Sequence, residues 1–307
     1  MKKCSLIYNP IATGFNRKEL DTICNLITDK GYTLELLESN YAGHVIELVK
    51  AANNSDLTIS MGGDGTVRDA IMGYQNIDQK SLYSHISTGT TNDIASNFRL
   101  LKKDPIESTK LILDGKEQGF DIVRVNGEAF AYVSCFGYLA KVPYETSLKM
   151  KRIFGKGGYV IRAFTHDLLH KPINYRISYT IDGKKQTTSC LFGAVSNSKG
   201  FGGINIYPMA EIDDGVFEVL FLNELNLKGL CSLIIDYFKG GVDLSKYSNI
   251  LTHVVTDNIK IEFEDQIPVD PIDNDGDRAN FILDANNNYL DYHYDGKVKM
   301  LLPGKRS

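Results

Sequence analysis

The chain has 307 residues, of which 43% are hydrophobic and 23% are charged. This composition is typical of a globular protein with two domains and a core of ordinary size. The formal net charge of −4 excludes the general basic field that indicates nucleic-acid binding, so no nucleic-acid partner is expected. The five cysteines are scattered without a Cys-x-x-Cys pair, which favours free thiols in a reducing cytoplasm over zinc or redox sites.

Secretory and membrane-spanning segments are not expected. The apolar run after Met1 is broken at Asn9-Pro10, too soon for a signal peptide. No later window reaches the length of a membrane span. A membrane-bound substrate would therefore be reached from the aqueous side, and the chain is expected in the cytoplasm.

The first part of the chain alternates short apolar runs with segments of helical periodicity. Strands are predicted at residues 4–8, 33–37, 57–61 and 82–87, and helices at residues 17–30, from residue 44 onward and at residues 67–74. This alternation is the pattern of a Rossmann-like parallel sheet covered by helices. Ligands of such sheets bind at the carboxyl ends of the strands, where the loops after the first three strands lie.

The loop after the third strand carries three glycines around one acid, in the sequence Gly62-Gly63-Asp64-Gly65-Thr66. Glycine permits positive φ angles and close approach of a ligand to the backbone, and exposed N–H groups at such a turn bind anions. The Asp64 carboxylate would repel a phosphate, but it suits a Mg²⁺ ion between phosphates and protein. The pattern favours a nucleotide with its metal, although an ordinary strand-to-helix turn with a capping Asp has the same composition.

A second turn of the same kind follows the fourth strand, in the sequence Gly89-Thr90-Thr91-Asn92-Asp93. By itself it predicts a helix N-terminus with Asn92 or Asp93 as the cap. The same residues also supply hydroxyl groups for a phosphate and a second carboxylate for a metal. Both interpretations are compatible with one structure.

After residue 118 the pattern becomes β-rich. Strands are predicted at residues 119–125, 129–136, 172–182, 186–195, 215–222, 258–263 and 297–302, with helices at residues 142–169 and 227–237. The predicted organisation is an α/β domain over residues 1–118, a β-sandwich domain over residues 119–290, and a C-terminal segment over residues 291–307 whose strand returns to the first domain.

Taken together, the motifs resemble those of the diacylglycerol kinase catalytic-domain family, the soluble bacterial lipid kinases related to sphingosine kinases. The resemblance covers nearly the whole chain. It rests on the Asn-Pro loop at residues 9–14, the two glycine turns, and, in order, Asn197, Gly202-Gly203, Pro208 and Asp213-Asp214-Gly215. It implies an α/β nucleotide domain resembling phosphofructokinases and NAD kinases, then a β-sandwich, with the active site in the cleft between them.

The resemblance also implies site residues. An ATP site would be formed by Asn9, Pro10, Ile11, Ala12, Thr13, Gly14, Ser39, Gly62, Gly63, Asp64, Gly65, Thr66, Val67, Arg68, Asp69 and Thr90. A structural metal, expected to be Mg²⁺, would be bound by the Asp214 carboxylate and the backbone carbonyls of Glu211 and Val216, with water linking it toward the active-site acids Asp64 and Asp93. Without the resemblance, Asp213-Asp214-Gly215 is typical of an ordinary β-turn.

The general base of the family is the acid that closes a late Asp-Gly-Glu motif, and its equivalent here is Asp277 in Asp275-Gly276-Asp277. The shorter Asp side chain still supplies a carboxylate, although general-base catalysis is sensitive to reach. Asp295, before Gly296 at the predicted start of the last strand, is a second candidate. Arg68 stands where the family usually has Asn, after the Gly-Asp-Gly-Thr-aliphatic run. It either clamps phosphate or marks an altered nucleotide or a lost activity.

The predicted function is ATP-dependent transfer of the γ-phosphate to a lipid hydroxyl, with diacylglycerol giving phosphatidate. The alternatives are a soluble-substrate kinase of the NAD kinase type and a nucleotide- or lipid-binding module that has lost catalysis. The lipid would be met at the inner face of the membrane, and a homodimer is compatible with the sequence. The candidate contacts with anionic lipid, which a solvated helix face would equally explain, are Lys149, Lys151, Arg152, Lys156 and Arg162.

Overall fold

The computed structural model describes residues 1–75, 77–90, 92, 94, 98–137, 140, 173–181, 183–201, 204–224, 226–238, 243–268 and 272–303. The chain divides into two compact units, one of residues 1–121 and 296–307 and the other of residues 122–295. The chain passes from one unit to the other within β5 (Lys116–Val125) and within β18 (Tyr289–Leu302). The sequence predicts the first of these divisions after residue 118 and a returning segment from residue 291.

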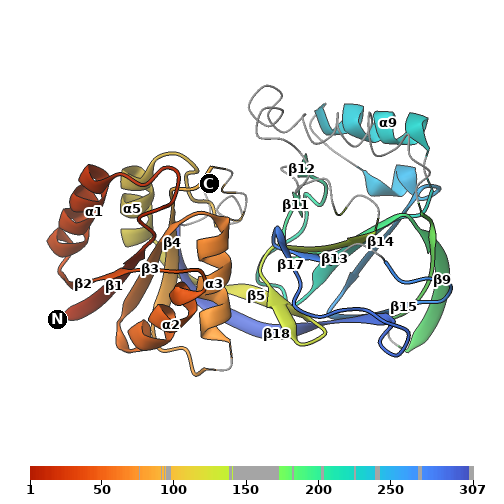
Figure 1. The fold of residues 1–307 in the computed structure, drawn as a ribbon. Helices are drawn as coiled ribbons and strands as arrows, with labels where there is room; N and C mark the ends of the chain where they lie inside the picture. The colour runs from red at the N-terminus through yellow and green to blue at the C-terminus, as the bar shows by residue number, and fades with distance from the viewer. Residues whose placement is uncertain are drawn as a thin grey trace. The chain divides into compact units, whose positions relative to one another are not determined.

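The first unit contains a parallel sheet with the strand order β2 (Tyr32–Glu38), β1 (Lys2–Tyr8), β3 (Leu57–Gly62) and β4 (Leu82–Ser87). The C-terminal part of β18 adds to it, since Met300 pairs in parallel with Tyr83. Helices α1 (Arg17–Asp29) and α5 (Pro105–Leu113) cover one face, and α2 (His44–Ala51) and α3 (Asp64–Tyr74) cover the other (Figure 1). A 3₁₀ turn, η1 (Ala52–Asn54), follows α2.

The helices of this unit follow from local sequence. The Asn16 side chain caps α1 by accepting a hydrogen bond from the Lys18 N–H, and the apolar side of α1 is buried. Helix α5, which the sequence analysis does not predict, has an Asp104 cap and Pro105 in its first turn. Helix α3 begins at Asp64 and not at the predicted residue 67, because Gly63 already has the extended conformation of an N-cap.

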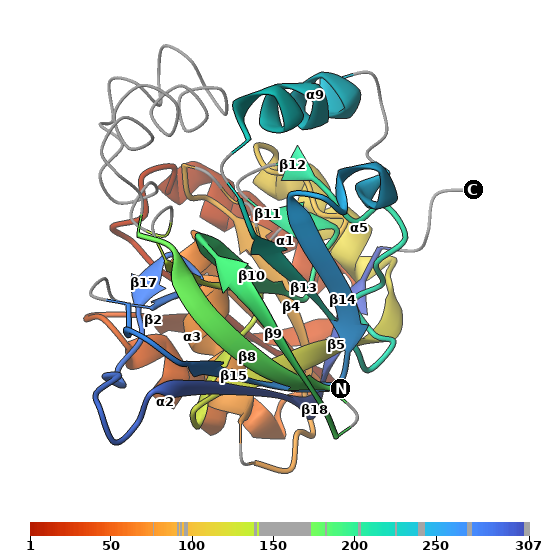
Figure 2. The same ribbon diagram turned by 90° about the vertical axis from the view of Figure 1, so that its right-hand side faces the viewer.

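The second unit consists mainly of antiparallel strands in two sheets (Figure 2). One sheet has the order β14 (Leu251–Thr256), β13 (Phe217–Leu222), β10 (Phe192–Ser196), β7 (Val133–Gly137), β16 (Asp273–Asn274) and β17 (Asp277–Arg278). The other has β9 (Lys184–Cys190), β8 (Tyr175–Ile181), β15 (Asn258–Phe263) and the N-terminal part of β18, with the hairpin of β5 and β6 (Glu128–Phe130) beside it. The remaining elements are β11 (Gly200–Phe201), β12 (Ile204–Asn205), α9 (Leu227–Phe238) and η4 (Leu244–Tyr247).

Aromatic and branched side chains from both sheets form one core between them. Phe136 of β7 packs edge-to-face on Phe263 of β15, with ring centroids 5.5 Å apart, and Tyr179 of β8 lies against Phe221 of β13. All four rings are buried. This two-sided core confirms the predicted antiparallel sandwich, as the parallel sheet of the first unit confirms the predicted α/β fold.

Several strand boundaries differ from the sequence predictions. The predicted strand 186–195 is two strands, β9 and β10, because the chain passes from one sheet to the other at Leu191. The predicted strand 129–136 also divides, into β6 and β7. Strand β14 is not predicted, and β18 begins at Tyr289, so Asp295 and Gly296 lie inside a strand and do not open one. The predicted helix at residues 142–169 lies outside the described residues.

A polar network is buried between β3 and β4 of the first unit. The Ser60 hydroxyl lies 2.7 Å from the Tyr83 hydroxyl and 2.8 Å from His85 Nδ1. All three side chains are at most 1% exposed. Burial lowers the pKa of His85 to about 3, although hydrogen bonds to the backbone of Gly62 and Ser60 oppose this shift. The imidazole is therefore neutral at physiological pH. It lies beside the backbone of Gly62, where the first glycine turn begins.

Because the folded-state pKa of His85 lies below its value of 6.5 in the unfolded chain, the unfolded state binds an extra proton between these two values. The free energy of unfolding should therefore fall as the pH drops from about 6.5 toward 4. We expect His85→Gln, which keeps a polar partner for Ser60, to reduce this slope by up to about 1.4 kcal/mol per pH unit. Urea unfolding of both proteins from pH 7 to pH 4 measures it, and equal slopes would contradict the prediction.

Candidate functional site

Three loops of the first unit leave the same edge of the parallel sheet. Tyr8, the last residue of β1, pairs with Glu38 of β2 and with Met61 of β3. Beyond the strands, the Ser39 N–H donates to the Tyr8 carbonyl, and the Asn9 N–H donates to the Met61 carbonyl. The loops after β2, β1 and β3 therefore begin side by side, as the sequence predicts for a parallel sheet.

Two hydrogen bonds hold the Asn9 loop, one to the Asn9 side chain and one to Thr88, the residue after β4. Asn9 Oδ1 accepts a hydrogen bond from the Ile11 N–H at 3.1 Å, and the Gly14 N–H donates to the Thr88 carbonyl at 2.8 Å. A Cβ atom on Gly14 would lie only 2.8 Å from that carbonyl oxygen, which is a backbone atom. Glycine is therefore required at this position. The predicted residues Pro10, Ala12 and Thr13 lie in the same loop.

The two glycine turns pack against each other through bare backbone. A Cβ on Gly89 would lie 2.6 Å from Gly63 Cα, so a side chain there would separate the two turns. The Thr88 N–H also donates to the Gly62 carbonyl at 2.7 Å. Gly62 itself lies against Thr66, where a Cβ would meet Thr66 Oγ1 at 2.2 Å. Close packing therefore accounts for Gly62 and Gly89.

Gly65 has no such structural requirement. It lies in the first turn of α3, it is exposed, and no heavy atom lies within 4 Å of a Cβ built on it. Its φ is not in the positive region either. Glycine inside a helix costs about 1 kcal/mol relative to alanine. The helix therefore carries a destabilising residue at the point where its N-terminal N–H groups lie, and Gly63, the N-cap, provides no side-chain cap.

Asp64 joins the first turn to the second. Its Oδ1 accepts a hydrogen bond from the Ile94 N–H at 3.0 Å. In the second turn, the buried Asn92 has a φ of 51° and binds the turn at both ends: its Oδ1 accepts from the Gly89 N–H, and its Nδ2 donates to the carbonyls of Gly89 and Lys102. Asn92 thus holds the turn together through its side chain. Thr91 and Asp93 lie outside the described residues.

The other predicted nucleotide residues surround these turns. Arg68, one helical turn into α3, donates from Nη2 and Nε to Asp69 Oδ1, at 3.0 and 3.3 Å. Both side chains are less than a quarter exposed. Ser39 is buried at the end of β2, and Thr90 is exposed after Gly89. Val67 and Thr66 are buried in α3.

The predicted metal residues lie in a turn of the second unit, just before β13. Gly215 has a φ of 81°, and Asp214 Oδ1 accepts a hydrogen bond from the Val216 N–H at 3.2 Å. The Asp214 carboxylate is exposed, and Glu211 is partly buried. Within the described ranges, no three or more His, Cys, Asp or Glu side chains gather as a metal site. One carboxylate with two backbone carbonyls is nevertheless an all-oxygen donor set, which suits a hard cation such as Mg²⁺.

The Asp275-Gly276 turn joins β16 and β17 in a two-residue hairpin, with positive φ at both residues. The Asp275 carboxylate accepts hydrogen bonds from the N–H groups of Ala131, Tyr132 and Val133, at 2.7, 2.7 and 3.0 Å. These contacts produce the bend that divides β6 from β7. Asp277 is exposed at the start of β17. The two acids of the motif therefore differ in role, and Asp275 is structural.

The remaining candidates also have defined places. Asp295, the second candidate base, lies inside β18 and pairs with Arg124 at 2.5 Å, which makes it a structural ion pair. Asn197 is buried after β10, and its N–H donates to the Tyr132 carbonyl. Pro208 is exposed in a turn. Gly202-Gly203 and the basic residues from Lys149 to Arg162 lie outside the described residues.

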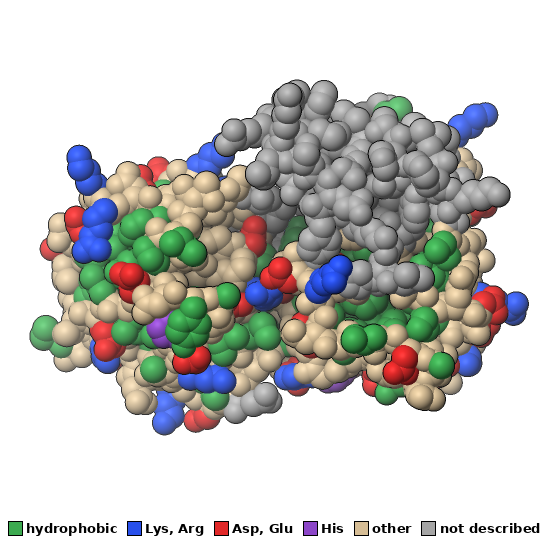
Figure 3. Space-filling view, in the orientation of Figure 1, with side chains coloured by type: hydrophobic (Ala, Val, Ile, Leu, Met, Phe, Trp, Pro, Cys, Tyr) green, Lys and Arg blue, Asp and Glu red, His purple; other side chains and the backbone are tan. Residues whose placement is uncertain are grey.

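Sequence reasoning missed three residues that support the site: His85, Asn92 as a loop tether, and Asp275. A signal was present for His85, because Thr58 and Ser60 of β3 and Tyr83 and His85 of β4 place polar groups at alternate positions of two neighbouring strands. No comparable signal separates Asp275 from Asp277, since both flank the same glycine. On the face shown in Figure 3, acidic and basic side chains are interspersed, in keeping with the small net charge.

The fold and these turns define a class of proteins in which an α/β domain with glycine turns at its carboxyl edge is followed by an antiparallel sandwich. A crystal structure of a diacylglycerol kinase from Bacillus anthracis has this fold, with a TM-score of 0.75 and 20% identity over 98% of this chain and 97% of that chain. The diacylglycerol kinase catalytic domain model matches residues 3–125, and the model of the YegS C-terminal NAD kinase beta sandwich-like domain matches residues 133–280.

Curated relatives show the same similarity. A diacylglycerol kinase of Bacillus subtilis is 27% identical over 231 residues, which are 74% of this chain and 76% of the relative. One from Staphylococcus epidermidis is 30% identical over 235 residues, 75% of this chain and 73% of the relative. The chain belongs to the diacylglycerol kinase catalytic-domain family. None of the helices in the described part of the chain is long and apolar enough to cross a membrane.

The contrast between Asp275 and Asp277 can be tested by stability. Asp275→Ala leaves three backbone N–H groups without their acceptor, so we expect a loss of about 2 kcal/mol or more in the free energy of unfolding. Asp277→Ala removes an exposed carboxylate and should change it by no more than about 0.5 kcal/mol. Thermal and urea unfolding measure both variants. Equal destabilisation would show that the two acids do not differ in role.

Proposed function

We propose that the protein is an ATP-dependent lipid kinase that transfers the γ-phosphate to a lipid hydroxyl, with diacylglycerol as the acceptor and phosphatidate as the product. The observation that carries the proposal is Gly65, a glycine without a packing or φ requirement in the first turn of an uncapped helix. A phosphate that approaches the backbone closely explains why a side chain is absent there. Membership of a kinase family supports the same interpretation.

The nucleotide would be bound by the loops at the carboxyl edge of the parallel sheet. Backbone N–H groups at the start of α3 favour negative charge through both hydrogen bonds and the helix dipole. The Asn9 loop, which is tied to Thr88 through Gly14, lies beside them. Asp64 remains a half-buried carboxylate at this edge, where it suits a cation that accompanies the phosphates. Arg68, which forms an ion pair with Asp69 one helical turn into α3, would place its guanidinium near the same turn, where a positive charge suits phosphate.

Mg²⁺ at the nucleotide would be held by Asp64, where it would neutralise charge on phosphate oxygens. A separate, structural metal would be held by Asp214 and the carbonyls of Glu211 and Val216 in the second unit. The chain's own residues then position the nucleotide and accept a proton. Asp277 is the proposed general base for the lipid hydroxyl, because it is exposed while Asp275 is committed to three backbone N–H groups. Contact with anionic lipid through residues 149–162 remains a prediction from the sequence.

Asp64→Asn tests the proposal. The Asn Oδ1 can still accept the Ile94 N–H, so the variant should fold normally. We expect it to lose about 100-fold or more of the rate of phosphoryl transfer. Asp29→Asn, an exposed carboxylate on α1, is the matched control and should keep wild-type activity. Asp64→Asn with near wild-type turnover would refute the assigned role.

The acceptor is identified by incubating the wild-type protein with γ-labelled ATP and mixed micelles that contain diacylglycerol, ceramide, sphingosine, monoacylglycerol or undecaprenol, with NAD as the soluble substrate. Label in phosphatidate supports the proposal. Label in NAD alone would establish the soluble-substrate alternative. Tight ATP binding without transfer to any acceptor would establish a module that has lost catalysis.

Gly65→Ala separates folding from ligand binding. Alanine has a higher helix propensity and meets no neighbouring atom, so the melting temperature should stay the same or rise slightly. The added methyl group would obstruct a phosphate at the backbone, and we expect the KM for ATP to rise by about 10-fold or more. Gly62→Ala is the contrasting variant, since its Cβ would meet Thr66 and should lower stability. An unchanged KM for Gly65→Ala would contradict the phosphate assignment.

A further inference from the structure

Tyr41 and His44 form an exposed aromatic pair after β2, on the same edge of the sheet as the glycine turns. Their ring centroids are 4.4 Å apart and their planes differ by 13°, so the rings are stacked. Tyr41 is nevertheless 56% exposed. A ring that is covered on one side and this exposed has one face that a flat ligand can reach.

Both rings are held in fixed orientations by hydrogen bonds. The Tyr41 hydroxyl donates to Glu47 Oε1 at 3.0 Å, one turn along α2. His44 Nδ1 accepts from the Asn40 N–H at 3.1 Å, so the proton of the neutral imidazole lies on Nε2. Gly43, which lies between Tyr41 and His44 along the chain, has a φ of 83°. This φ favours glycine, and it turns the chain into α2. The loop therefore presents Tyr41 as a pre-formed flat surface.

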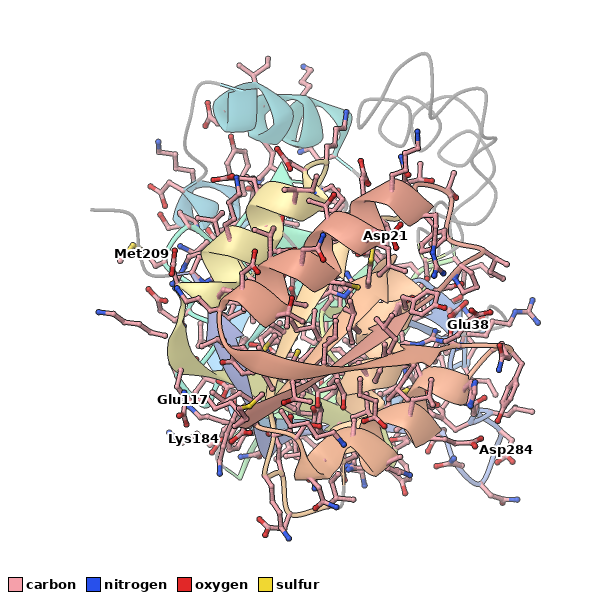
Figure 4. All side chains as sticks on the ribbon, turned by 90° about the vertical axis from the view of Figure 1, so that its left-hand side faces the viewer. Asp21, Glu38, Glu117, Lys184, Met209 and Asp284 are labelled. Carbon is pink, nitrogen blue, oxygen red and sulfur yellow. The ribbon has the colours of Figure 1, made fainter. Side chains whose placement is uncertain are left out.

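The position of this pair relative to the glycine turns limits its ligand. Strand order places β1 between β2 and β3, so the loop after β2 begins two strand spacings, or about 10 Å, from the turn after β3. Glu38 ends β2 (Figure 4), and its Oε2 accepts a hydrogen bond from the Tyr8 hydroxyl at 2.6 Å. A carboxylate here repels phosphate, but its oxygens can accept hydrogen bonds from the hydroxyl groups of a ribose. The nucleoside end of a nucleotide fits the β2 loop, and its phosphates fit the β3 turn.

We propose that the free face of the Tyr41 ring stacks on the purine base of the nucleotide, with His44 as the positioning residue behind it. The inference rests on the proposed function, because it takes the phosphates to lie at the start of α3. It adds a base-binding site to the phosphate site. Stacking of a base on an aromatic side chain contributes about 1–3 kcal/mol, which corresponds to about 5- to 150-fold in affinity.

The test compares the dissociation constants of ATP and of tripolyphosphate, which lacks a base, by isothermal titration calorimetry. We expect Tyr41→Ala to weaken ATP binding by about 5- to 150-fold and to leave tripolyphosphate binding unchanged. Tyr41→Phe keeps the ring and should bind ATP within about 2-fold of the wild type. Glu47→Gln is the matched control that changes the hydroxyl partner and retains the ring. A thermal melt checks that each variant is folded.

The outcomes separate this inference from the proposed function. Unchanged ATP affinity in Tyr41→Ala would overturn the base site while leaving wild-type lipid phosphorylation intact. An equal loss of ATP and tripolyphosphate affinity would also overturn it, since the pair would then only shape the loop at the start of α2. If the wild-type protein binds ATP but transfers no phosphate, the proposed kinase activity is contradicted. The proposed base site then still stands if Tyr41→Ala weakens ATP binding alone. A wild-type protein that binds no ATP would overturn both.

Discussion

The backbone contact between Gly63 and Gly89 is the constraint on which the candidate site depends. Two turns that are separated along the chain can lie this close because Gly89 has no side chain, since a Cβ there would lie 2.6 Å from Gly63 Cα. Hydrogen bonds reinforce the contact on each side, from Thr88 to Gly62 and from Ile94 to Asp64. The carboxyl edge of the sheet thereby becomes a rigid arrangement of backbone N–H groups and one acid. Rigid donors are what phosphoryl transfer requires, since its catalysis is mainly positioning and charge stabilisation.

The glycines of one short motif differ in what surrounds them. A Cβ on Gly62 would meet the Thr66 side chain at 2.2 Å, whereas a Cβ on Gly63 would make only an ordinary contact with Gly89 Cα at 3.4 Å, and a Cβ on Gly65 would meet no atom within 4 Å. Packing therefore explains Gly62, and Gly65, which is exposed in the first turn of α3, is the position that points most directly to a ligand. A sequence motif therefore does not identify its own functional positions. The structure shows which positions are explained by packing, and the positions that remain are the candidates for ligand binding.

Much of the fold was predictable from the sequence, because its local signals agree with the final structure. The alternation of buried strands and amphipathic helices predicts the parallel sheet, and the predicted bounds 82–87 and 258–263 match β4 and β15. Continuous apolar sequence around Leu191 hides the change from β9 to β10, since periodicity cannot show that a chain changes sheets. The residues around Asp275 and Asp277 carry no local signal that shows which of them is structural, and only the N–H groups of Ala131, Tyr132 and Val133 reveal the role of Asp275.

The central claim is that this chain transfers phosphate from ATP to a lipid hydroxyl. The most direct measurement is the transfer of label from γ-labelled ATP to diacylglycerol in mixed micelles, with separation of the lipid products. We expect labelled phosphatidate with the wild-type protein and a loss of about 100-fold or more with Asp64→Asn. Label in no lipid, or equal labelling by Asp64→Asn and the wild type, would contradict the claim.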